Sequence, residues 1–185
     1  IMEIGFPGGY GFYGVADILS GEANPSGHLT DTYAVTNANS PAAQNFGNYE
    51  WTNADPAVNI NAEEVEAEGI YTGYKYYETR YADTVLGQGN ADATVGSSTG
   101  KAWNYDDEVS YPFGYGLSYT TFETKVLSTV LKDNKIVVET ETINTGDTYS
   151  GKEVVQLYAT CPAGKLEKEY RRLVAFDKTG LLAPG

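Results

Sequence analysis

The apolar residues of this 185-residue chain change their spacing once, at the stretch Tyr111–Phe122. Before this stretch they recur at helical intervals between long polar segments, and after it they alternate as they do in β-strands. The stretch reads Tyr-Pro-Phe-Gly-Tyr-Gly-Leu-Ser-Tyr-Thr-Thr-Phe, with Gly114 and Gly116 on either side of one tyrosine. Glycine is favoured where φ is positive or where another backbone comes close, so we expect a tight, packed junction here.

The part before the junction has the pattern of an α/β unit. The end of a buried strand (1–4) is followed by a glycine-rich turn (5–11) and by apolar residues at helical spacing from Phe12 to Leu19. Gly21 stands where a helix C-cap belongs. Strand, glycine turn and helix together open an α/β unit. We expect a long loop over 31–62, a helix over 62–81 and a second long loop over 82–110.

The part after the junction predicts antiparallel strands. Alternation marks strands at 124–130, 135–143 and 152–160, and a fourth is expected at 170–176. Strands about ten residues apart with short turns are typical of a β-sandwich of immunoglobulin or fibronectin type III character. Four or five strands do not complete one, so we expect a sandwich that is truncated at Gly185.

Charge and composition exclude several functional classes. The net charge is −13, and the first 100 residues hold 13 acidic and 2 basic side chains, against 12 and 10 in the remainder. An acidic surface repels phosphate backbones, so nucleic acid is not an expected partner. No apolar run approaches the ~20 residues that cross a bilayer, so we expect a soluble protein without a membrane partner, either cytoplasmic or secreted.

The chain has little material for metal or nucleophile chemistry. Cys161 and His28 are the only cysteine and the only histidine, which excludes an internal disulfide and argues against a zinc site or a Ser-His-Asp triad. The acidic run Asp106–Glu108 fits no EF-hand spacing, and its acids are read as surface charge. We expect no metal and no cofactor.

Carboxylates and tyrosines are the remaining candidates for chemistry. Glycoside hydrolysis needs a pair of carboxylates, but the sequence does not single out one pair among 25 acids, and the acids at 63–68 are also explained by a predicted helix start. Sixteen tyrosines are a better indication, because the tyrosine ring and hydroxyl suit both faces of a sugar. Trp51, Tyr76 and Tyr77 are the candidate substrate-binding residues, and a core role is the alternative for each.

Four blocks, in this order, resemble the second half of a glycoside hydrolase of family 3, the β-glucosidase and β-xylosidase group. They are Gly5–Gly11 continuing through Ala16–Leu29, Glu68–Glu78, the junction at 111–122, and Asn144–Gly146 with Gly151–Tyr158. The second block is similar to the family's Glu-Gly-Ile helix, and the fourth is similar to its fibronectin type III-like domain. His28 stands where a basic residue is usual, and Thr30 replaces the usual proline.

The resemblance implies a fold and a function. Residues 1–121 would be the C-terminal part of the family's α/β sandwich domain, and residues 122–185 a truncated fibronectin type III-like domain. The chain would then be the C-terminal portion of a retaining, exo-acting β-glycosidase, a β-glucosidase, acting on β-linked oligosaccharides or glycosides. The family's Ser/Thr-Asp-Trp nucleophile motif and the region that carries its acid/base are not in this chain.

No catalytic residue is therefore assigned, and residues 1–185 alone are expected to be inactive. The expected partner is the remainder of the same enzyme, namely its catalytic barrel and the start of its sandwich domain. The alternative from another class is a non-catalytic carbohydrate-binding or cell-surface β-sandwich module, which requires a complete sandwich and an exposed aromatic platform.

Overall fold

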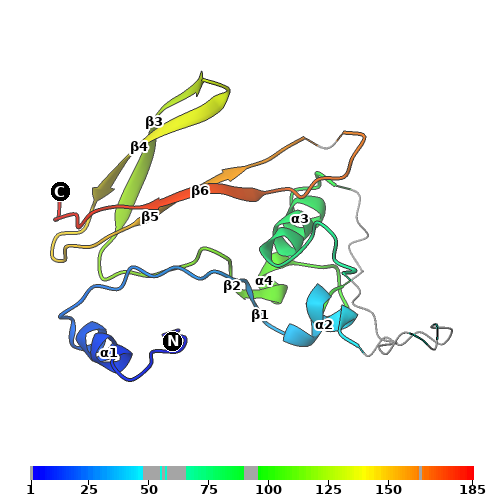
Figure 1. The fold of residues 1–185 in the computed structure, drawn as a ribbon, viewed down its shortest axis with the longest axis horizontal. Coiled ribbons are helices and arrows are strands. Elements are labelled where there is room, and N and C mark those ends of the chain that lie inside the picture. Colours follow the sequence, from blue (N-terminus) through cyan, green and yellow to red (C-terminus); the bar gives the residue numbers. More distant parts are fainter. Residues whose placement is uncertain (1, 48–54, 56, 58–65, 90–95, 163) are drawn as a thin grey trace. The chain divides into compact units, whose positions relative to one another are not determined.

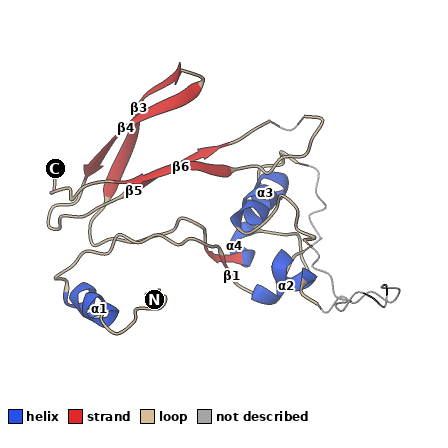
Figure 2. Cartoon of the chain, in the orientation of Figure 1, coloured by secondary structure: helices blue, strands red, loops and turns tan. Residues whose placement is uncertain are grey.

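A computed structural model describes residues 2–47, 55, 57, 66–89, 96–162 and 164–185. The chain divides into two compact units, each built from separate stretches of sequence. Unit 1 comprises Ile1–His28, Gly116–Leu157 and Ala175–Gly185, and unit 2 comprises Leu29–Tyr115 and Tyr158–Val174. The described part contains short helices and two-stranded sheets (Figures 1 and 2). The domain boundary expected at 121/122 stays a prediction.

Unit 1 begins with the predicted helix. Helix α1 spans Gly11–Ser20, and Gly21 follows it in the left-handed conformation (φ 83°) with its N–H bonded to the Ile18 carbonyl. This confirms the glycine C-cap. The strand expected at the start of the chain does not form over the described residues 2–4. A strand needs a neighbour for its backbone hydrogen bonds, and none is paired with these residues.

The long hairpin of unit 1 confirms the predicted change to strand periodicity. Strands β3 (Phe122–Lys132) and β4 (Lys135–Asn144) pair antiparallel, with an irregularity between Val126 and Ser128. Asp133 and Asn134 at its turn both have positive φ (51° and 59°), as a type I′ turn requires. Strands β5 (Val154–Ala159) and β6 (Arg172–Lys178) form a second two-stranded sheet.

Unit 2 is built around helix α3. Its elements are β1 (Tyr33–Ala34), the 3₁₀ helix η1 (Asn37–Asn39), α2 (Pro41–Asn45), α3 (Tyr74–Thr84), α4 (Tyr105–Glu108) and β2 (Val109–Tyr111). Strands β1 and β2 pair antiparallel. The helix predicted over 62–81 begins only at Tyr74. Gly69 and Gly73 both adopt positive φ, which a regular α-helix does not contain, so the helix cannot start before Gly73. Residues 62–65 lie outside the described residues.

The two glycines of the junction have the two expected roles. Gly114 has a φ of 78°, and its N–H bonds to the Leu29 carbonyl at 2.8 Å. Gly116 has ordinary φ but lies against another stretch of backbone: a Cβ added there would lie 2.5 Å from the Gly27 carbonyl oxygen and 2.9 Å from the His28 ring. The packed junction expected from the sequence is confirmed.

Gly116→Ala is expected to destabilise unit 1 by about 1–3 kcal/mol, because the backbone of Gly27 has no side-chain freedom with which to escape the new methyl group. The matched control is Gly9→Ala, where an added Cβ meets no atom within 4 Å and φ is not positive. Thermal unfolding of both variants measures the difference. Equal melting temperatures for the two variants would contradict a close approach at Gly116.

Candidate functional site

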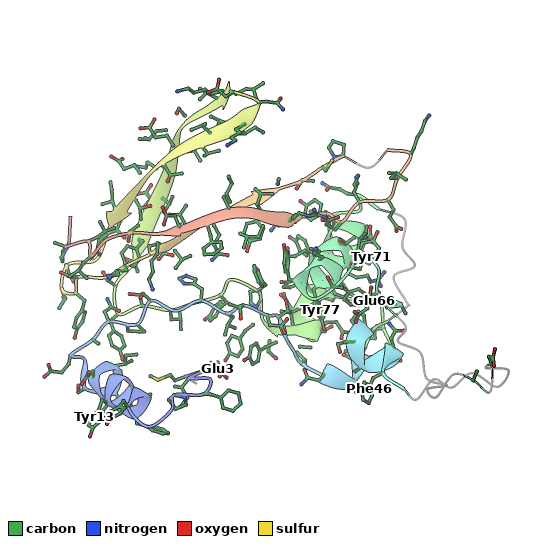
Figure 3. All side chains as sticks on the ribbon, viewed as in Figure 1. Glu3, Tyr13, Phe46, Glu66, Tyr71 and Tyr77 are labelled. Atoms are coloured by element: carbon green, nitrogen blue, oxygen red, sulfur yellow. The ribbon has the colours of Figure 1, made fainter. Side chains whose placement is uncertain are left out.

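The candidate site of unit 2 is a cluster of aromatic and charged side chains around α3, here called the α3 cluster. Its members are Tyr77, Glu78, Arg80, Trp103, Tyr105 and Glu108. Tyr77 lies on α3 (Figure 3) and is only 6% exposed; with Trp103, at 3%, and Val109 it forms the apolar core of the unit. The Arg80 guanidinium lies 5.5 Å from the centre of the Trp103 ring, within cation–π distance.

Glu78 joins two segments that are far apart in sequence. Its carboxylate accepts the Tyr105 hydroxyl at 2.8 Å and lies 3.3 Å from a guanidinium nitrogen of Arg171. Burial, together with the negative charge of Glu78 and the hydrogen bond to it, raises the pKa of the Tyr105 phenol. The phenol therefore stays protonated and remains a donor at neutral pH.

Two further carboxylates fix loops to the same helix region. Glu108 is 4% exposed and accepts the Ser98 N–H at 2.6 Å. Glu167 accepts the Tyr71 hydroxyl at 2.6 Å, and burial together with this bond raises the pKa of Tyr71. Tyr71, which is labelled in Figure 3, precedes α3 in the chain.

Glu169 is another buried acid near this region, and its partner is the Arg172 guanidinium. Burial by itself raises the pKa of this carboxyl, but the hydrogen bond from Arg172 and the positive charges of Arg172 and Lys75 outweigh it, so the pKa lies below its usual value. Glu169 is therefore ionised at neutral pH.

The junction segment packs directly on α3. The ring of Phe113 stacks on Tyr74 with centroids 4.2 Å apart, and Tyr158 meets both rings edge-on. The Tyr74 hydroxyl oxygen accepts the Leu173 N–H at 2.8 Å. One aromatic residue of the junction thus holds the start of α3 in place.

The three predicted substrate-binding residues have different settings. Trp51 lies outside the described residues. Tyr76 is half-buried, with its ring edge-to-face on Tyr77 at 5.1 Å, and burial raises its pKa against the opposing effect of Arg80. Burial raises the pKa of Tyr77 to about 12. Both tyrosines contribute to the core of unit 2, and a contact with substrate stays a prediction for each.

The α3 cluster is suited to holding structure rather than to transferring protons. Glu78, Glu108, Glu167 and Glu169 each accept a hydrogen bond from a phenol, a backbone N–H or a guanidinium. Each of these carboxylates is therefore engaged with a partner group within unit 2. Over the described ranges, no three His, Cys, Asp or Glu side chains gather as metal ligands. No helix in that part of the chain is long and apolar enough to cross a membrane.

Sequence reasoning missed the residues that organise this cluster. Arg80 and Trp103 are not part of a recognisable sequence motif. Their pairing depends on a contact between residues that lie 23 positions apart in the chain. A large aromatic residue in the polar, glycine-rich stretch 82–110 was the one available signal, since such a residue has to be buried somewhere. In unit 1 the missed residue is Asn144, which stood out in the sequence only as part of the block Asn144–Gly146.

Comparisons with known proteins identify the wider class. The chain is 34% identical to a β-glucosidase of Ruminococcus albus over all of its own length and 15% of the relative's. It matches the crystal structure of a β-glucosidase from Paenibacillus barengoltzii with a TM-score of 0.71 and 38% identity, over 95% of this chain and 15% of that one. No family model matches the chain.

A third relative carries the family name. The GH3 β-glucosidase of Bifidobacterium adolescentis matches with a TM-score of 0.66 and 26% identity, over 95% of this chain and 20% of that one. In sequence and fold, the chain matches a limited, C-terminal portion of β-glucosidases of glycoside hydrolase family 3. It spans less than a quarter of the length of these relatives.

Proposed function

We propose that this chain is the C-terminal portion of a retaining, exo-acting β-glucosidase, and that the catalytic carboxylates lie in a part of the enzyme outside residues 1–185. The observation that carries the proposal is the match of nearly the whole chain to a limited segment of β-glucosidases. The two carboxylates of the α3 cluster support the proposal. Glu78 accepts a hydrogen bond from Tyr105 and Glu108 accepts one from Ser98, so these acids stabilise loops instead of forming a reactive pair.

We also propose the finer domain composition: residues 1–121 complete an α/β sandwich domain, and residues 122–185 begin a fibronectin type III-like domain. The exposed apolar side chains of the β3–β4 hairpin support this. By the strand register, Val126, Leu131 and Ile136 share one face, and all three are strongly exposed. A sandwich needs this face covered by a second sheet.

The proposed partner is accordingly the rest of the same enzyme. The opposite face of the hairpin is mixed, with Lys125 paired across from Glu141 and Val130 across from Val137. Helix α1 also leaves apolar side chains exposed. None of its residues is buried, and Phe12 and Leu19 are both exposed. Large exposed apolar faces of this kind mark surfaces that pack against other protein.

The expected result is hydrolysis of 4-nitrophenyl β-glucoside by the full-length enzyme and no detectable hydrolysis by residues 1–185 alone. Release of 4-nitrophenolate measures both. Turnover by residues 1–185 alone would show that the catalytic carboxylates lie within this chain. Absence of turnover by the full-length enzyme, with turnover of the corresponding xyloside, would contradict the glucoside assignment but keep the glycosidase class.

A further inference from the structure

Unit 1 contains a hollow of about 600 Å³ between the loop that follows α1 and the loop between β4 and β5. Its lining comes from residues 21–24, Ser26 and residues 148–152, with Lys178 and Leu181 from near the end of the sequence. Cavities of roughly 300–1,000 Å³ are the size that small-molecule ligands occupy. None of these residues belongs to the α3 cluster.

The walls of the hollow are fixed by hydrogen bonds. Asn24 donates its Nδ2–H to the Ser150 carbonyl at 3.0 Å, and its Oδ1 accepts the Ser118 hydroxyl and the Tyr119 N–H, both at 2.8 Å. Lys178 donates from Nζ to the Ser26 carbonyl at 3.0 Å. The two loops therefore hold their spacing without a ligand, which lowers the ordering cost of binding.

The lining combines one aromatic ring with hydrogen-bond donors and hydrogen-bond acceptors. Tyr149 is 44% exposed, and its ring centre lies 5.9 Å from that of Tyr119, so the ring is held in place while part of it remains open. Glu22 supplies a carboxylate acceptor and Lys152 an ammonium donor, both on exposed side chains. Lys178 keeps two further N–H donors after bonding Ser26.

This combination matches the chemistry of a pyranose ring. A pyranose offers apolar C–H faces, which pack on a tyrosine ring, and a rim of hydroxyls that donate and accept hydrogen bonds. A phosphate or nucleotide is a poorer fit because Glu22 places a negative charge in the same lining. An apolar ligand would make no use of Glu22, Lys152 or the loop hydroxyls.

We propose that this hollow binds a pyranose unit of a β-linked glucan, with Tyr149 as the stacking ring and Lys152 as a hydrogen-bond donor. The choice of a β-linked glucan rests on the proposed function.

The experiment is native electrophoresis of the full-length enzyme in gels that contain increasing amounts of soluble mixed-linkage β-glucan. Wild type is expected to be retarded. Tyr149→Ala is expected to raise the dissociation constant about tenfold, because it removes the stacking ring, and Lys152→Gln severalfold. Tyr149→Phe keeps the ring and should keep most of the retardation. Lys132→Gln, which removes the same charge at the β3–β4 turn, serves as the control and should match wild type.

The outcomes separate this inference from the proposed function. An unretarded wild type, unchanged retardation of Tyr149→Ala, or equal losses for Lys152→Gln and Lys132→Gln would overturn the binding site, even if the enzyme hydrolyses 4-nitrophenyl β-glucoside. Retardation that depends on Tyr149 in an enzyme without that hydrolysis would leave the site standing and overturn the proposed function. Circular dichroism of each variant confirms that the fold is retained.

Discussion

Replacing Asn144 by leucine is expected to destabilise unit 1 by about 3–5 kcal/mol, because several buried polar groups lose their partner at once. Asn144 is 1% exposed, at the end of β4. Its Oδ1 accepts the Thr120 hydroxyl at 2.6 Å and the Gly146 N–H at 3.0 Å. Its Nδ2 donates to the carbonyls of Tyr149 at 2.8 Å and Leu182 at 3.0 Å. No apolar side chain of similar size can satisfy these four groups.

Hydrogen exchange of peptides covering 144–151 in the full-length enzyme measures this effect locally. Asn144→Asp is a second variant: it keeps the acceptor, removes both amide donors and buries a carboxyl, so faster exchange is expected there too. Asn134→Gly is the matched control, because this asparagine is exposed in the β3–β4 turn and its φ of 59° suits glycine. Unchanged exchange in Asn144→Leu would mean that the four bonds do not hold this region together.

The strands were predictable because alternation is a local property. Period-two alternation placed β3, β4, β5 and β6 within a few residues of their ends. The start of α3 was not predictable from helix formers alone. Residues 66–73 contain helix formers, but Gly69 and Gly73 take positive φ, and glycine in sequence does not reveal its own φ.

The α3 cluster was only half predictable. The sequence indicated a helix that ends near Tyr81 and gave a core role as the alternative for Tyr77, and Tyr77 has this core role. The partners of this helix were not predictable, because Trp103, Phe113 and Tyr158 arrive from distant parts of the chain. Long-range pairs such as Glu78 with Tyr105 and Arg171 depend on tertiary structure, and a single sequence contains no periodic signal for them.

The core of unit 2 depends on a single large side chain more than on any charge pair. Trp103 is 3% exposed, contacts the buried core with Tyr77 and Val109, and provides the ring face for the Arg80 guanidinium. Tyr105 lies edge-on to it at 6.1 Å. Removal of this ring leaves a cavity and also deprives a nearly buried guanidinium of its cation–π contact, so two costs coincide.

Trp103→Ala is therefore expected to destabilise unit 2 by about 3–5 kcal/mol, the usual cost of deleting a large aromatic side chain from a core. Trp103→Phe keeps a ring under Arg80 and should cost less than half as much. Hydrogen exchange of peptides covering Tyr74–Thr84 in the full-length enzyme measures both, with Phe46→Ala, an exposed aromatic residue just after α2, as the control. Equal protection of α3 in Trp103→Ala and Phe46→Ala would contradict a core built on Trp103. A graded loss from Phe46→Ala through Trp103→Phe to Trp103→Ala would instead show that this ring holds α3, and with it Tyr76 and Tyr77, in position.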